Sequence, residues 1–194
     1  MAREIIVATG NRHKVQEIGE ILSPLGYDVK SANDVGGMPE VVEDAETFEG
    51  NAVKKAVETA KALGRMVLAD DSGLEVFALN GEPGVYSARY AGEGGNDGRN
   101  LAKLLAKMEG VAERSARFVC VIAVAAPDGL VGTAEGEVRG RIALASMGQG
   151  GFGYDPAFIP DGYEQTFGQL PQEVKNSLSH RSNALKAAIA KKLL

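Results

Sequence analysis

Two adjacent aspartates at the end of an apolar run constrain the fold of this chain more than any other feature. Residues 66–69 have the composition of a buried strand, and Asp70-Asp71-Ser72-Gly73 follows them directly. Adjacent aspartates are poor strand formers, and they repel each other unless a cation or a proton lies between them. Aspartate, serine and glycine are also common in solvated turns. We therefore expect the strand to end at Ala69, in either a turn or a metal site.

The composition limits the class of protein. The 194 residues are 44% hydrophobic and 24% charged, which is typical of a folded globular chain. The net charge of −5 argues against a protein that mainly coats nucleic acid, because such proteins carry a basic surface. No apolar run approaches the ~20 residues of a membrane helix, and the N-terminal residues lack the pattern of a signal peptide. We expect a soluble, cytoplasmic protein whose partners include neither nucleic acid nor a membrane.

The cysteine and histidine content argues against a disulfide and against zinc. The single cysteine, Cys120, lies in the apolar run 118–126 and is expected in the core. The two histidines, His13 and His180, are far apart in the sequence, and CxxC and HExxH motifs are absent. A zinc site is therefore not expected.

Hydrophobic periodicity predicts alternating strands and helices. Consecutive apolar residues at 5–8 predict a strand covered on both faces, and a short strand is expected at 27–31. Two apolar runs flank Pro127-Asp128-Gly129, which is a hairpin signal, so the sheet should be mixed. Helical spacing predicts helices at five places: after Gly10-Asn11, from Thr47 to Gly64, over 96–108, after Pro171 and after Ser179.

The turn between the first strand and the first helix is a candidate anion site. A helix N-terminus offers backbone N–H groups without helical partners and a favourable dipole, and Lys14 adds a positive charge. A plain strand–helix connection fits equally well, and the spacing of a Walker motif is absent. Phosphate binding at Thr9 to Lys14 therefore needs support from the rest of the chain.

A glycine-rich segment, Gly148 to Pro156, is the second unusual stretch. It contains the letters GxGxxG, but it does not open a helix, and Asp155-Pro156 favours extended backbone. We therefore interpret it as a flexible loop that presents Phe152 and Tyr154. The ring of Phe152 either stacks on a flat ligand such as a single base or fills a gap in the core.

Five motifs occur in order along the chain: Thr9-Gly10-Asn11 with Lys14, Ala69-Asp70-Asp71-Ser72-Gly73, Ser87-Ala88-Arg89-Tyr90, Gly150-Gly151-Phe152-Gly153-Tyr154-Asp155-Pro156 and Ser179-His180-Arg181. Together they resemble the inosine triphosphate pyrophosphatase family, which acts on non-canonical purine nucleoside triphosphates. The resemblance runs from about Val7 to the last helix. At one position this chain departs from the family: many members carry glutamate where it has Gly50, so no catalytic acid is expected there.

The resemblance implies a fold, an assembly and a reaction. The fold would be α/β, a single domain over residues 1–194 with an elongated mixed β-sheet flanked by helices and two lobes around a deep central cleft. The assembly would be a homodimer. The reaction would be hydrolysis of ITP, dITP and XTP to the monophosphate and pyrophosphate, with Mg²⁺ as cofactor.

The resemblance also implies roles for particular residues. Asp71 would bind the metal and accept a proton, and Glu43 would reach the metal from the preceding loop, although Asp44 is close enough to exchange places with it. Lys55 would face the phosphates, or else lie on a solvated helix face. Other residues would contact the substrate: Thr9, Gly10, Asn11, Arg12, His13 and Lys14 at the triphosphate, Ser72, and around the base Phe152, Gly153, Tyr154, Asp155, Lys175, His180 and Arg181.

The chemistry of these residues agrees with those roles. Mg²⁺ takes oxygen ligands, usually one or two carboxylates together with phosphate oxygens and water. Lys175, His180 and Arg181 are hydrogen-bond donors that would match the C6 keto oxygen of inosine or xanthine. Two alternatives are a pyrophosphatase of broader specificity and a non-catalytic purine-nucleotide sensor. Paired aspartates argue against a sensor, because anions beside a triphosphate are costly without a metal.

Overall fold

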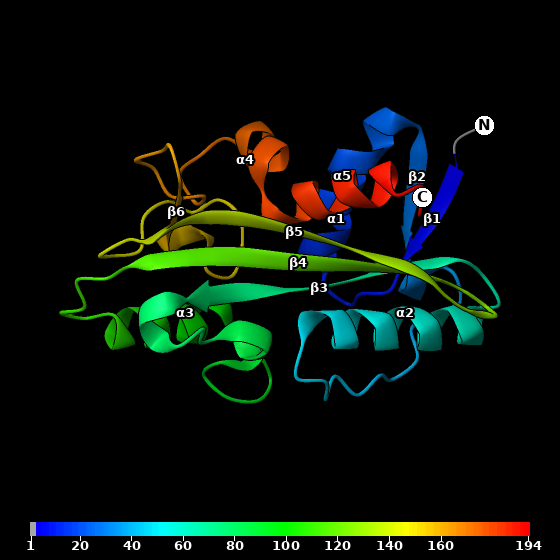
Figure 1. The fold of residues 1–194 in the computed structure, drawn as a ribbon, viewed down its shortest axis with the longest axis horizontal. Helices are drawn as coiled ribbons and strands as arrows, with labels where there is room; N and C mark the ends of the chain where they lie inside the picture. The colour runs from blue at the N-terminus through cyan, green and yellow to red at the C-terminus, as the bar shows by residue number, and fades with distance from the viewer. Residues whose placement is uncertain (1–2) are drawn as a thin grey trace. The chain divides into compact units, whose positions relative to one another are not determined.

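The computed structural model describes residues 3–194 and contains a six-stranded mixed β-sheet (Figure 1). The strand order is β2-β1-β3-β4-β5-β6. β1 runs parallel to both β2 and β3, whereas β5 and β6 are antiparallel. The expected α/β class with a mixed sheet is therefore confirmed. The strands are β1 (Arg3–Val7), β2 (Tyr27–Ser31), β3 (Val67–Val76), β4 (Ser115–Ala126), β5 (Gly129–Ile142) and β6 (Phe158–Pro160).

Five α-helices accompany the sheet in the described part of the chain, and their ends follow local sequence signals. The Thr47 side chain caps the second helix by accepting from the N–H of Gly50, and Gly64 ends that helix with a φ of 64°. No helix within residues 3–194 combines the length and apolar character needed to cross a membrane. The helices are α1 (Arg12–Leu22), α2 (Phe48–Leu63), α3 (Asp97–Lys107), α4 (Gln172–Leu178) and α5 (His180–Ala190).

The chain forms two compact units. The first contains the residues up to Asp71, together with Cys120–Gly136 and Arg181–Leu194, and the second contains Ser72–Val119 and Glu137–His180. The boundaries between the units fall inside β3, β4 and β5, so each of these strands contributes residues to both.

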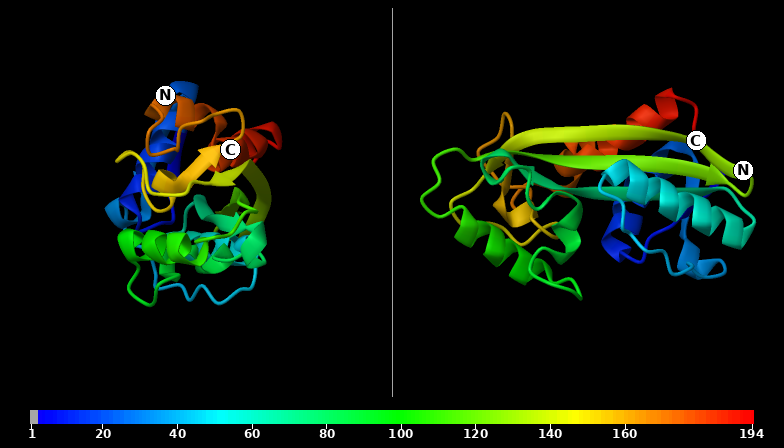
Figure 2. Two further views of the ribbon diagram at one scale, coloured as in Figure 1. Left: turned by 90° about the vertical axis from the view of Figure 1, so that its left-hand side faces the viewer. Right: turned by 60° about the horizontal axis from the view of Figure 1, so that its bottom comes forward.

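In the first unit, helices cover both faces of the strands. α1 and α5 lie on one face and α2 lies on the other (Figures 1 and 2). Burial on both faces explains the consecutive apolar residues at 5–7, 67–69 and 120–125 in β1, β3 and β4. Cys120 is buried here and not bonded to another cysteine, as expected from the sequence. The core on the α1 and α5 side includes Val7, Ile18, Leu22, Leu68, Cys120, Ile122, Ala184, Leu185 and Ala188.

In the second unit, the core is built around three phenylalanine rings. The ring centroids of Phe118 and Phe158 lie 4.7 Å apart, and those of Phe158 and Phe167 lie 5.3 Å apart. Tyr154 belongs to the same buried cluster, and its hydroxyl donates to the carbonyl oxygen of Ser87 at 2.8 Å. The expectation that the glycine-rich loop presents Tyr154 is therefore wrong. Burial of that ring fixes the loop to the core.

The expectation that the strand ends at Ala69 is also wrong. β3 continues through both aspartates to Val76, so the segment is neither a turn nor the end of a strand. Successive side chains of a strand point to opposite faces of the sheet. Asp70 and Asp71 therefore face away from each other, and the repulsion expected between adjacent carboxylates does not arise between their side chains.

Candidate functional site

Asp70 lies on the face of β3 that α1 and α5 cover. Its side chain is fully buried, and its Oδ2 accepts from Nε and Nη2 of Arg181 at 3.2 and 2.9 Å. Nζ of Lys14 lies 3.2 Å from Oδ1. Burial alone would raise the pKa of this carboxyl, but Lys14 and Arg181 outweigh it and hold the pKa of Asp70 below its usual range. Asp70 is thus a buried, ionised anchor for two cations.

Arg181 is shared by two carboxylates of the first unit. Besides Asp70, its guanidinium binds the carboxylate of Glu17, which is buried on α1. The sequence interpretation did not identify Glu17. Its position three residues after Lys14, on the same side of a helix, was the available signal. Arg181 itself was expected beside a purine base, whereas in this structure its side chain is completely buried against Asp70 and Glu17.

Asp71 lies on the opposite face, toward α2. Its Oδ1 accepts from Nζ of Lys55 at 3.1 Å, and within residues 3–194 its buried Oδ2 has no hydrogen-bond partner. Burial raises the pKa of Asp71, and the positive charges of Lys55 and Lys14 oppose that rise only in part. This carboxylate therefore binds a proton more readily than an exposed aspartate does.

Lys55 joins Asp71 to the acidic loop that precedes α2. Its Nζ also donates to Oε2 of Glu43 at 2.9 Å. Burial opposes the charge of Lys55, but the carboxylates of Asp71, Asp70 and Glu43 raise its pKa overall, so it stays protonated. Lys55 is 6% exposed, which contradicts the alternative of a solvated helix face.

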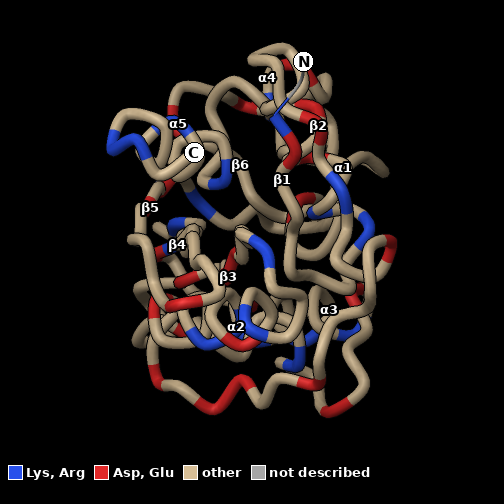
Figure 3. The backbone as a smooth tube through the Cα atoms, turned by 90° about the vertical axis from the view of Figure 1, so that its right-hand side faces the viewer, with Lys and Arg blue, Asp and Glu red and all other residues tan. Residues whose placement is uncertain are grey.

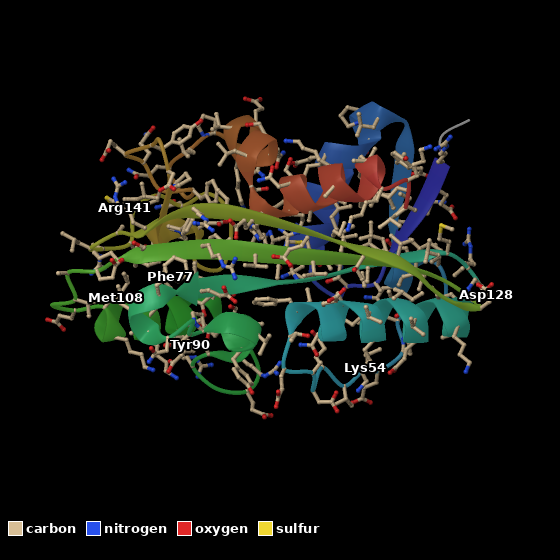
Figure 4. The ribbon with its side chains drawn as sticks, viewed as in Figure 1. Lys54, Phe77, Tyr90, Met108, Asp128 and Arg141 are labelled. Carbon is tan, nitrogen blue, oxygen red and sulfur yellow. The ribbon has the colours of Figure 1, made fainter. Side chains whose placement is uncertain are left out.

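Asp44 points away from this group. Its Oδ1 pairs with Nζ of Lys54 at 2.8 Å, and the Asp44 side chain is largely exposed. Lys54 lies on the side of α2 away from the strands (Figure 4). In this structure, therefore, Glu43 rather than Asp44 is the acidic-loop carboxylate that shares a cation with Asp71.

These residues fit a divalent metal ion of the Mg²⁺ type. The unpartnered Oδ2 of Asp71 is a buried oxygen with both lone pairs available, and Glu43 offers a second carboxylate. Mg²⁺ commonly takes one or two carboxylates and completes its coordination with phosphate oxygens and water. Among residues 3–194 there is no group of three or more histidine, cysteine or acidic side chains arranged to hold a metal. Asp71 and Glu43 are the residues that would hold the ion.

The turn before α1 is closed by its own side chains. Oγ1 of Thr9 accepts from the N–H of Asn11 at 3.1 Å. Oδ1 of Asn11 accepts from the N–H groups of His13 and Lys14 at 2.9 and 3.3 Å. The first-turn amides of His13 and Lys14, which lack helical partners as expected, are therefore capped by the Asn11 side chain in this structure. Arg12 and His13 are exposed on this turn.

In the second unit, Asp155 holds the glycine-rich loop in shape. Its Oδ2 accepts from the N–H of Phe152 at 2.8 Å and from Nζ of Lys175 at 2.6 Å. A Cβ atom on Gly151 would lie 2.1 Å from the same oxygen, so only glycine fits there. Both Asp155 and Lys175 are buried. Lys175 and Asp155 form a buried ion pair, and the Asp155 carboxylate also fixes the loop backbone at Phe152.

Phe152 is the aromatic residue that this arrangement leaves partly exposed. Nζ of Lys175 lies 5.0 Å from the centroid of its ring, a cation–π contact. The N–H of Gly153 donates to Asp97 at 2.9 Å, a loop contact that the sequence did not indicate. Phe152 is thus less buried than Tyr154, the other aromatic residue of the loop.

His180 and Ser72 are also residues of the second unit. The His180 imidazole stacks on Phe118, with centroids 4.7 Å apart and an angle of 13° between the rings. Ser72 follows Asp71 on β3 and is partly exposed.

Acidic and basic residues are interspersed along the described chain, so the lysines and carboxylates of the first unit do not belong to a region of one charge (Figure 3).

Comparisons with known proteins agree with the motifs. A protein named dITP/XTP pyrophosphatase from Desulforamulus reducens is 53% identical over 188 residues, covering 96% of this chain and 94% of the relative. A Bacillus subtilis protein of the same name is 49% identical over 186 residues, covering 95% of this chain and 94% of that protein.

Solved structures show the same fold. The Staphylococcus aureus Ham1 protein matches with a TM-score of 0.84 and 44% identity, covering 99% of this chain and 100% of that one. A nucleoside-triphosphatase or dITP/XTP pyrophosphatase from Mycobacterium abscessus matches with a TM-score of 0.76 and 42% identity over 96% of this chain and 98% of that one. The model of the Ham1 family matches residues 5–191, so this chain belongs to the Ham1 family.

Proposed function

We propose that this protein hydrolyses the non-canonical purine nucleoside triphosphates ITP, dITP and XTP to the monophosphate and pyrophosphate. The observation that carries the proposal is the buried Oδ2 of Asp71, which has no hydrogen-bond partner within residues 3–194 and belongs to a carboxylate that shares Lys55 with Glu43. The names of relatives about half identical to this chain support the substrate class. We also propose a cytoplasmic homodimer, on the family resemblance of the five sequence motifs alone.

In the proposed reaction, water attacks the α-phosphorus, the bond from that phosphorus to the bridging oxygen breaks, and pyrophosphate leaves. A bound Mg²⁺ would neutralise phosphate charge and favour ionisation of the attacking water. Asp71 and Glu43 would hold the ion. Asp71 would also accept the proton of the attacking water.

The lysines of the first unit supply positive charge for the triphosphate. Lys55 is protonated beside Asp71, and Lys14 stands beside Asp70 at the first turn of α1. Phosphoryl transfer depends mainly on positioning and on neutralisation of charge, and fixed lysines provide both. The turn residues Thr9 to His13 would bind the phosphates together with Lys14, and Ser72 would contact the substrate next to Asp71.

The proposed base contacts use Phe152 for stacking and Lys175 and His180 as donors. Arg181, which was also expected at the base, is buried against Asp70 and Glu17 and would act by holding those two carboxylates. Lys175 already lies against the Phe152 ring, where the edge of a stacked base would come within reach of its ammonium group. Hypoxanthine and xanthine offer a C6 keto oxygen, whereas adenine offers an amino group that would face these donors. A buried donor left without an acceptor costs about 1–3 kcal/mol, which disfavours ATP. Gly153, Tyr154 and Asp155 would act by shaping the loop.

Steady-state kinetics with ITP, XTP, dITP, ATP and GTP test the proposed specificity. We expect kcat/KM for ITP to exceed that for ATP by roughly 10²–10⁴, since a site built on hydrogen bonds discriminates strongly against an unmatched partner. Similar kcat/KM values for ITP and ATP would show instead a pyrophosphatase of broad specificity.

Replacement of Asp71 tests the catalytic role. Asp71→Asn keeps the shape of the side chain but removes the proton acceptor, so kcat should fall by roughly 10²–10⁴. Binding of ITP, measured by calorimetry, should remain. Asp44→Asn is the matched control, because Asp44 is an exposed carboxylate of the acidic loop paired with Lys54, and it should keep wild-type turnover. Full activity of Asp71→Asn would contradict the assignment.

Replacement of Phe152 tests base stacking. Phe152→Ala should weaken substrate binding by about 1–3 kcal/mol, seen as a raised KM for every purine triphosphate. Tyr86→Ala, which removes an exposed ring of the same unit, should leave KM unchanged. A lower melting temperature with unchanged KM would show that the Phe152 ring serves the fold alone.

A further inference from the structure

One buried amide fastens the acidic loop to α2. Asn51 is 1% exposed, and its Oδ1 accepts from the N–H of Ala45 at 3.0 Å. Its Nδ2 donates to the carbonyl oxygen of the same residue at 3.3 Å. A single side chain therefore satisfies both backbone polar groups of Ala45 and fixes the loop at that residue.

Gly50 lets the loop come this close. A Cβ atom at position 50 would lie 2.7 Å from the Cβ of Ala45 and 3.1 Å from Oγ1 of Thr47. Glycine lowers helix propensity, so its presence within the first turn of α2 calls for a reason. The reason is the close approach of the Ala45 methyl group to the backbone of α2 at Gly50, which leaves no room for a side chain at that position.

Ala45, the residue that Asn51 holds, lies close in the sequence to Glu43, one of the two carboxylates of the proposed metal site. Glu43 precedes Ala45 by two residues, and Lys55 lies one helical turn after Asn51 on α2. One turn of the helix thus holds the loop backbone, and the next turn holds the Glu43 carboxylate at 2.9 Å from Nζ of Lys55. The same ammonium group is 3.1 Å from Asp71.

We propose that Asn51 is a positioning residue: by bonding the backbone of Ala45, it holds Glu43 opposite Asp71 and so preorganises both carboxylates for a divalent cation. The absence of a side chain at Gly50 allows Ala45 to come close enough for these bonds. The proposal rests on the proposed metal site. Loss of the contact would leave the loop held to α2 by the Glu43–Lys55 and Asp44–Lys54 ion pairs, which hold side chains rather than the backbone. Groups that orient metal ligands typically contribute about 10–100-fold to metal affinity.

Binding of Mn²⁺ to the full-length protein, measured by electron paramagnetic resonance without nucleotide, tests the proposal. Asn51→Ala removes both bonds to Ala45 and should weaken Mn²⁺ binding by roughly tenfold or more. Gly50→Ala should weaken it as well, although the substitution raises helix propensity. Ala45→Gly removes the methyl group that Gly50→Ala would meet at 2.7 Å, so the double variant should regain most of the lost Mn²⁺ affinity, the 3.1 Å contact with Oγ1 of Thr47 remaining.

Two controls separate positioning from folding. Lys54→Gln breaks only the exposed Asp44–Lys54 ion pair and should keep wild-type Mn²⁺ affinity. Thermal unfolding, followed for each variant, identifies any that do not fold. If Asn51→Ala does not fold, Gly50→Ala and its reversal by Ala45→Gly decide the question.

The outcomes distinguish this inference from the proposed function. Unchanged Mn²⁺ affinity in both Asn51→Ala and Gly50→Ala, with binding by the wild type, would overturn the positioning role and leave the metal site intact. A Gly50→Ala defect that Ala45→Gly does not reverse would contradict the role of the contact at Ala45. If the wild type binds Mn²⁺ neither alone nor together with a non-hydrolysable nucleoside triphosphate analogue, the metal site itself is contradicted, and this inference with it.

Discussion

The alternation of side chains along one strand is the constraint on which the site depends. Because β3 continues through Asp70 and Asp71, the two carboxylates point to opposite faces of the sheet. Each carboxylate then meets its own cations, Arg181 and Lys14 on one face and Lys55 on the other. Neighbours in the sequence thereby acquire different electrostatic environments without any change in residue type.

Those environments give the two aspartates different properties. Asp70 is paired with Lys14 and Arg181, which hold its pKa low, so it behaves as a fixed negative charge that ties α1 and α5 to β3. The pKa of Asp71 is raised by burial, and this residue keeps one oxygen without a hydrogen-bond partner in the described part of the chain. A buried ionised anchor beside a carboxylate poised for a proton or a metal is typical of a catalytic centre.

The sequence predicted the features that depend on local chemistry and missed those that depend on distant partners. The 27–31 strand and the helix signals at Thr47 and Gly64 agree with the structure, because capping and periodicity are local. Continuation of the strand through Asp70 was missed because its cations come from residues that are distant in the chain. Burial of Tyr154 was missed for the same reason, since its hydroxyl bonds to the distant Ser87.

Titration of the aspartate carboxyl carbons by ¹³C nuclear magnetic resonance, in the metal-free protein, tests the division between Asp70 and Asp71 most directly. An ordinary aspartate titrates near pH 3.9, at about the value of an unperturbed side chain. The account predicts that the resonance of Asp71 titrates above that value, whereas Asp70 stays ionised to well below it, as far down as the fold persists. Titration of both carboxyls together near the ordinary value, or of Asp70 before Asp71 as the pH falls, would contradict it.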